Sequence, residues 1–154
     1  SGNFYIAGST FNSLEGNTNQ GSSDIFIAKY DTDGNQIWYR QFGTTGEDVP
    51  YSMTISSDDY IIVGGTVGDS LEGQTSAGAS DLFIAKYDSN GNQIWAKQYG
   101  STETDAIFCM YSDLGGTVFL GGITTGTLVT DYTRAGTGDW DAFIMKISNS
   151  GEIQ

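Results

Sequence analysis

The chain has 154 residues and carries 19 acidic against 6 basic side chains, a formal net charge of −13. Nucleic acids and anionic membranes are bound through basic patches, so this charge argues against both partners. No histidine and only one cysteine are present, which excludes histidine-based catalytic triads, histidine zinc sites and internal disulfides. We therefore expect no enzymatic activity. The high content of Gly, Ser, Thr and aromatic residues favours an all-β fold.

The first unit contains four expected strands. Residues 4–10 form the first, and a loop containing Ser-Leu-Glu-Gly follows. Residues 24–30, Asp-Ile-Phe-Ile-Ala-Lys-Tyr, alternate between two faces with period two, which predicts the second. The turn Asp-Thr-Asp-Gly-Asn then predicts a hairpin to a third strand over 36–43. The fourth is expected over 48–56.

The same series then recurs along the chain. Residues 13–43 and 70–100 are identical at 21 of 31 positions by direct count. A looser third copy begins at Asp141, and its three extra residues fall in the loop 126–140. The repeat units therefore run approximately over 2–58, 59–115 and 116–154.

Four short antiparallel strands per unit of about 57 residues are typical of β-propeller blades. A lone blade cannot bury both of its faces, so repetition supplies each blade with similar neighbours. Three blades do not close a ring. We expect further blades of the same polypeptide, or copies of this chain, to complete it.

Two strings carry a resemblance to a known family: GNFYIAGST, and GSSDIFIAKYDTDGNQIW with its second copy. In this order they resemble the SBBP repeat of bacterial and archaeal β-propellers. The likeness covers essentially the whole chain, although Ile147 and Ser148 replace the Tyr-Asp pair of the other copies. The resemblance implies a propeller in a secreted or cell-surface protein, with no established enzymatic activity.

A second likeness concerns the tryptophan-docking motif of pyrroloquinoline-quinone propellers. Ala28, Asp31, Gly34 and Trp38 approximate that motif, one residue out of step. The likeness implies that Trp38 and its counterpart Trp95 pack on the adjacent blade. It also implies an order of strands within each blade, with 48–56 nearest the central channel. On that count the chain holds strands two to four of one blade, a whole blade, and strands one to three of a third.

The acidic turns have two interpretations. Asp31, Asp33 and Asp88 present alternating oxygens of the kind that Ca²⁺ prefers. However, Gly34 comes too early for an EF-hand loop, and the expected bidentate Glu is absent, so a plain hairpin turn is the favoured explanation. We expect no cofactor, and calcium is the one candidate ion.

An aspartate and a lysine recur in every unit. Asp24, Asp81 and Asp141 open the second strand type and are expected to bond backbone amides there. The lysine five residues later is expected to pair with a carboxylate at a blade edge. Since they recur in every copy, we assign these side chains a structural role. Cys109 replaces Ser52 of the previous copy and is expected to be a small buried residue.

The loop between the last two expected strands is the longest and most varied, and it holds the candidate ligand-binding residues Asp131, Tyr132, Arg134, Asp139 and Trp140. Aromatic rings beside carboxylates suit a sugar, although Trp140 could instead pack on the next blade. The sequence thus favours a non-catalytic scaffold or binding module outside the cell, for a glycan or protein ligand. Alternatives are a carbohydrate-binding propeller, a calcium-stabilised element of a surface fibre, and a hydrolase whose acids lie in other blades.

Overall fold

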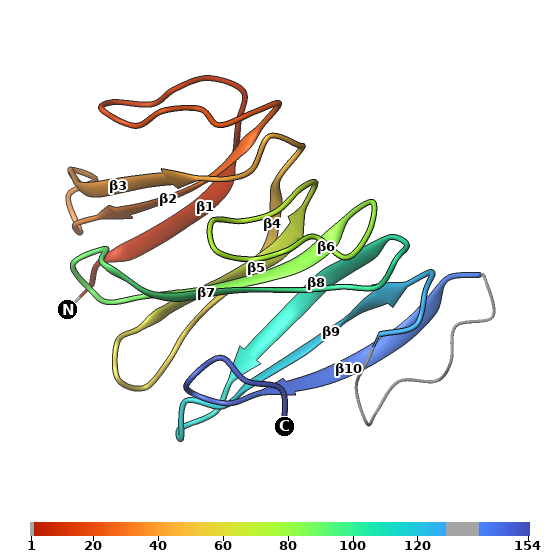
Figure 1. Cartoon of the computed structure of the whole chain (residues 1–154). Coiled ribbons are helices and arrows are strands. Elements are labelled where there is room, and N and C mark those ends of the chain that lie inside the picture. Colours follow the sequence, from red (N-terminus) through yellow and green to blue (C-terminus); the bar gives the residue numbers. More distant parts are fainter. Residues whose placement is uncertain (1, 129–138) are drawn as a thin grey trace.

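The computed structural model describes residues 2–128 and 139–154, which form three antiparallel sheets (Figure 1). Sheet 1 has the order β1-β2-β3, sheet 2 the order β4-β5-β6-β7, and sheet 3 the order β8-β9-β10. The strands are β1 (Phe4–Thr10), β2 (Asp24–Tyr30), β3 (Gln36–Phe42), β4 (Val49–Ile55), β5 (Ile61–Val67), β6 (Asp81–Tyr87), β7 (Gln93–Tyr99), β8 (Asp105–Ser112), β9 (Val118–Thr124) and β10 (Asp141–Ile147).

The all-β prediction is confirmed, as is the division into sheets of three, four and three strands. The order of strands within each sheet is also the expected one. In Figure 1 the sheets lie one after another, from sheet 1 at the top to sheet 3 at the bottom, and the described strands form no closed ring. No described segment forms a helix that is long and apolar enough to cross a bilayer.

The apolar core consists of two layers, one on each side of sheet 2. Ile25 and Ile27 of sheet 1 pack with Phe83 of β6, whereas Leu82 and Ile84 of β6 pack with sheet 3. All five side chains are 0% exposed. The alternation of β6 therefore buries both faces, which neither outer sheet can do without a further neighbour.

A repeated irregularity shapes the outer hairpin of sheets 1 and 2. The register of β2 with β3 shifts between Lys29 and Tyr30, and the same shift recurs between β6 and β7. In each case the isoleucine before the tryptophan, Ile37 or Ile94, is the unpaired residue and is about half exposed. This bulge places the lysine directly opposite the tryptophan of the next strand.

The expectation for Cys109 is wrong, because its side chain is exposed. Its counterpart Ser52 lies in the middle sheet, where the Ser52 hydroxyl accepts a hydrogen bond of 3.0 Å from the backbone amide of Met110 in β8. Cys109 occupies the same place on sheet 3, whose corresponding face is not covered by any other described sheet. Burial at this position therefore depends on a neighbouring sheet.

Candidate binding surfaces between the sheets

The junction of sheets 1 and 2 is centred on the turn between β6 and β7. Trp38 and Lys29 both donate to the carbonyl oxygen of Ser89, at 3.1 and 2.7 Å. Arg40 donates through Nε to the carbonyl of Gly91 at 2.7 Å. The indole also lies against Gly91, where a Cβ atom would come within 2.9 Å of the ring. Three side chains of sheet 1 are thus held by one turn of sheet 2, which we call a receiving turn (residues 88–92).

The junction of sheets 2 and 3 repeats this arrangement at the receiving turn 148–152. Trp95 donates to the carbonyl oxygen of Asn149 at 3.1 Å, and Lys86 donates to the side-chain oxygen of the same residue. In the place of an arginine, Lys97 forms an ion pair of 2.8 Å with Glu152. The partners of each tryptophan and lysine therefore lie more than 50 residues further along the chain.

These contacts correct the prediction for the repeated lysines. Lys29 and Lys86 do not pair with carboxylates but donate to a carbonyl and an amide oxygen of the receiving turns. Sequence reasoning also missed Arg40 and Lys97, which bond the same turns. The signal was available, because a basic residue follows each repeated tryptophan by two positions.

The aspartates that open the second strand type are bonded locally. Asp24 is fully buried and accepts hydrogen bonds from the backbone amide of Gln20 and the side-chain amide of Gln41, both at 3.0 Å. Asp81 is also fully buried and accepts the equivalent pair of bonds. Asp141 takes the corresponding place at the start of β10 and is half-buried. The two buried carboxylates fix the loop that precedes their strand to the strand that follows.

A second set of buried carboxylates opens the next sheet. Asp48 accepts hydrogen bonds from the amide and hydroxyl of Thr44 and from the amide of Gly68. Burial raises the pKa of this carboxyl, those three bonds oppose the rise, and nearby Asp24 adds to it. Asp105 holds the same position in sheet 3 and accepts bonds from Ser101. Asp48 and Asp105 thus stabilise the junctions, and the oxygens of both carboxylates already accept hydrogen bonds.

The candidate calcium ligands lie in two equivalent turns, Asp31 and Asp33 between β2 and β3 and Asp88 between β6 and β7. Asp31 accepts the backbone amides of Asp33 and Asn35 at 2.9 and 2.8 Å, and the side-chain amide of Asn35 at 3.0 Å. The hydrogen bond from the Asn35 side chain is the main reason why the pKa of Asp31 is lowered. Asp88 accepts the equivalent bonds, and its pKa is lowered for the same reason. Asp33 is exposed. Among residues 2–128 and 139–154, no group of three or more His, Cys, Asp or Glu side chains is placed to hold a metal ion.

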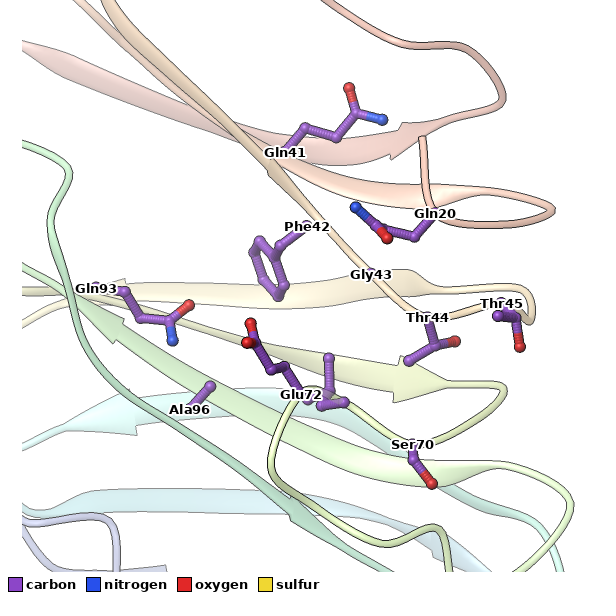
Figure 2. A pocket seen from close by; sticks show the side chains of 11 residues that line it. Gln20, Gln41, Phe42, Gly43, Thr44, Thr45, Ser70, Glu72, Gln93 and Ala96 are labelled. Carbon is purple, nitrogen blue, oxygen red and sulfur yellow. The ribbon is translucent and has the colours of Figure 1, made fainter. Parts of the chain in front are cut away.

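A polar pocket of about 600 Å³ lies between sheets 1 and 2. Figure 2 shows the Phe42 ring at its centre, with Gln41 and Gln20 on the sheet 1 side and Glu72 and Gln93 on the other. The side-chain amide of Gln41 already donates a hydrogen bond to Asp24. The Gln93 side-chain oxygen accepts the hydroxyl of a buried tyrosine. The amide nitrogen of Gln93 and the carboxylate of exposed Glu72 have no bond to the described residues and are available to a hydroxylated ligand beside an aromatic ring.

A second hollow, the β4–β8 groove, lies between sheets 2 and 3 and measures about 480 Å³. Its walls include Tyr51, Phe108, Trp140 and Glu47. Tyr51 and Phe108 meet edge to face at 5.8 Å and are 50% and 51% exposed, while Trp140 is 61% exposed. Three half-exposed aromatic rings in one groove form a surface suited to a partner's apolar or cationic side chains.

Of the five residues proposed for the long loop, two are described. Trp140 lies in the β4–β8 groove, and Asp139 is exposed beside it. Asp131, Tyr132 and Arg134 lie outside the described residues. The groove residues Tyr51 and Phe108 were missed, although they occupy the same position in successive repeats and are aromatic in both.

Comparison with known proteins gives two distant relatives and no matching family model. The chain is 25% identical to the regulatory protein FlaEY of Caulobacter vibrioides over 99% of its own length. It is 24% identical, over 86% of its length, to an uncharacterized WD repeat-containing protein of Acanthamoeba polyphaga mimivirus. It spans only 18% and 11% of these two relatives. A distant WD repeat-containing relative accords with the repeated all-β sheets.

Proposed function

We propose that the chain is a three-blade segment of a β-propeller of the SBBP type and acts as a non-catalytic scaffold for protein–protein interaction. The observation that supports it best is that both junctions have the same kind of contact, in which the tryptophan and lysine of one sheet donate hydrogen bonds to the receiving turn of the next. Propeller blades require such serial contacts between like sheets. The names of the two relatives, a regulatory and a WD repeat-containing protein, are consistent with a non-enzymatic role.

The buried aspartates also support a scaffold. Asp24, Asp48, Asp81 and Asp105 are each 0% exposed and accept hydrogen bonds from nearby loops. Carboxylates used in this way hold the loops and do not face a substrate. The repeated acids of this chain are therefore assigned to folding.

We place the protein-binding surface in the β4–β8 groove. Its aromatic rings supply a large apolar contact with few rotatable bonds, and Glu47 and the net negative charge favour a partner with basic residues. The test is a random peptide library panned against the immobilised chain. Selected peptides should combine aromatic and basic residues and should lose binding to Phe108→Ser and Trp140→Ser variants.

An Ile94→Ser variant is the matched control, because Ile94 is 51% exposed and does not line the groove. Peptides that bind wild type and both groove variants equally would remove the groove from the proposal. A library that yields no binder at all would contradict the protein-binding function.

Carbohydrate binding is the second candidate function, favoured by the pocket of Figure 2. Neutral amides, one carboxylate and the Phe42 ring are the groups that bind sugars. A glycan array should then show hits that Gln93→Ala abolishes, and an array without hits would reject this candidate. We further propose a secreted or cell-surface location, which protease accessibility on intact source cells would test.

A further inference from the structure

We infer that the two outer faces of the three-sheet stack are complementary, and that the sheet 3 face of one copy binds the sheet 1 face of a second copy of this chain. The inference rests on the proposed scaffold function and names a partner for it. The two junctions inside the chain show which contacts each outer face lacks.

The turn of sheet 1 is formed like a receiving turn, but no tryptophan or lysine of the described residues donates to it. The turn of sheet 1, residues 31–35, has the same hydrogen bonds around Asp31 as the receiving turn has around Asp88. Gly34 and Gly91 share a positive φ, 84° and 79°. A Cβ at Gly91 would meet the Trp38 indole, whereas no heavy atom of the described residues lies within 4 Å of one at Gly34. The turn is formed as at an occupied junction.

The flat part of the same face is exposed where its counterpart is buried. We define the sheet 1 end face by Phe4, Ile6, Phe26 and Tyr30. Phe4 and Ile6 are 44% and 43% exposed, while Ile61 and Val63, which hold these positions in sheet 2, are 0% exposed. Sheet 1 therefore presents to solvent the set of positions that sheet 2 buries against a neighbour.

The opposite end carries the complementary set. We define the sheet 3 end face by Phe119, Ala142, Ile144 and Lys146, which line an open and largely apolar hollow of about 560 Å³. Ile144 is 70% exposed, whereas its equivalents Ile27 and Ile84 are 0% exposed inside the two junctions. Lys146 occupies the position of Lys29 and Lys86, the lysines that bond receiving turns.

A second copy is the occupant because one chain carries both halves of the same type of junction at opposite ends. Docking would bring Lys146 to the carbonyl of Thr32 in the next copy, the position that Ser89 and Asn149 hold at the existing junctions. The contact is head to tail, so it builds multiples of the chain. Sheet 3 has no fourth described strand to supply a tryptophan, so we expect this junction to be weaker than the internal ones and dependent on concentration.

The test measures mass in solution by light scattering or sedimentation. Wild type should form multiples of 16.5 kDa as concentration rises. Salt should strengthen the association, because each copy carries a net charge of −13 and the contact itself is apolar. Ile144→Asp and Ile6→Asp should each abolish self-association, whereas Ile94→Asp, an isoleucine that stays 51% exposed in the covered middle sheet, should leave it unchanged.

Mixing the two blocked variants gives the sharpest result. Ile144→Asp retains an intact sheet 1 face and Ile6→Asp an intact sheet 3 face, so the mixture should form a one-to-one dimer of about 33 kDa, twice 16.5 kDa, and nothing larger. Circular dichroism confirms that each variant folds. Failure of the mixture to dimerise, or association of either variant alone, would overturn the inference and mark the contact as non-specific.

A wild-type chain that stays at the mass of one copy also overturns it, and then a further repeat unit of a longer polypeptide is the occupant. The peptide experiment on the β4–β8 groove is independent of this result, because none of the groove residues belongs to either end face. Failure of the self-association is thereby distinguished from failure of the scaffold function.

Discussion

Removal of the Trp38 indole is expected to weaken the first junction more than any other single truncation there. Trp38 is only 9% exposed, and a buried tryptophan removes roughly 200 Å² from water, which at about 25 cal/mol per Å² is about 5 kcal/mol. Its N–H bond to the Ser89 carbonyl adds about 1 kcal/mol. Because Lys29 still bonds that carbonyl and the junction edge can partly collapse, Trp38→Ala should cost about 3–4 kcal/mol.

The assay is urea unfolding followed by circular dichroism, with hydrogen exchange at the receiving turn 88–92 as a local measurement. Trp38→Phe should cost about 1–2 kcal/mol, since it retains most of the apolar contact and loses the hydrogen bond. Trp95→Ala should cost less than Trp38→Ala, because Trp95 is only partly buried. A loss below about 1 kcal/mol for Trp38→Ala, with unchanged exchange at the turn, would refute the lock between the sheets.

Three further predictions concern the turns and the buried acids. Gly91→Ala should destabilise the chain by about 2–3 kcal/mol, because it combines a positive φ with a clash against the Trp38 ring. Gly34→Ala has a similar φ but open space around its Cβ, so it should cost only about 1 kcal/mol. Equal losses of stability in urea unfolding would contradict the contact between Gly91 and Trp38. Burial raises the pKa of Asp48 above 3.8, so the folded state binds the proton of the Asp48 carboxyl more tightly than the unfolded state does. The stability of the fold that comes from this proton is lost as the pH rises through the raised pKa. Asp48→Asn should therefore lack the fall in stability that Asp48 causes between pH 3.8 and its raised pKa, and curves of wild type and variant that run parallel over that window would argue against the shift. Because the Asp31 oxygens already accept hydrogen bonds, a chelator should leave the melting temperature unchanged; a clear drop would favour calcium.

The candidate site was less accessible from sequence than the strands. Trp140 was singled out and does line the groove, but its partners Tyr51 and Phe108 come from strands that look ordinary in the sequence. Their edge-to-face contact joins two residues that lie 57 positions apart in the sequence. A strand pattern indicates which side chains share a face, but it does not indicate which strand of another sheet lies opposite.

The strands, their turns and their grouping into three sheets follow from local patterns along the sequence. The alternation in residues 24–30 and 81–87 and the Asp-Gly chemistry of the turns act over a few residues, and the repetition shows where each unit starts again. Which side chains lie between sheets depends instead on contacts between distant parts of the chain. Trp38 bonds a turn 51 residues away, and Ile144 is exposed where Ile84 is buried. The sequence is nearly the same at both isoleucines, and only the presence of a neighbouring sheet makes them different.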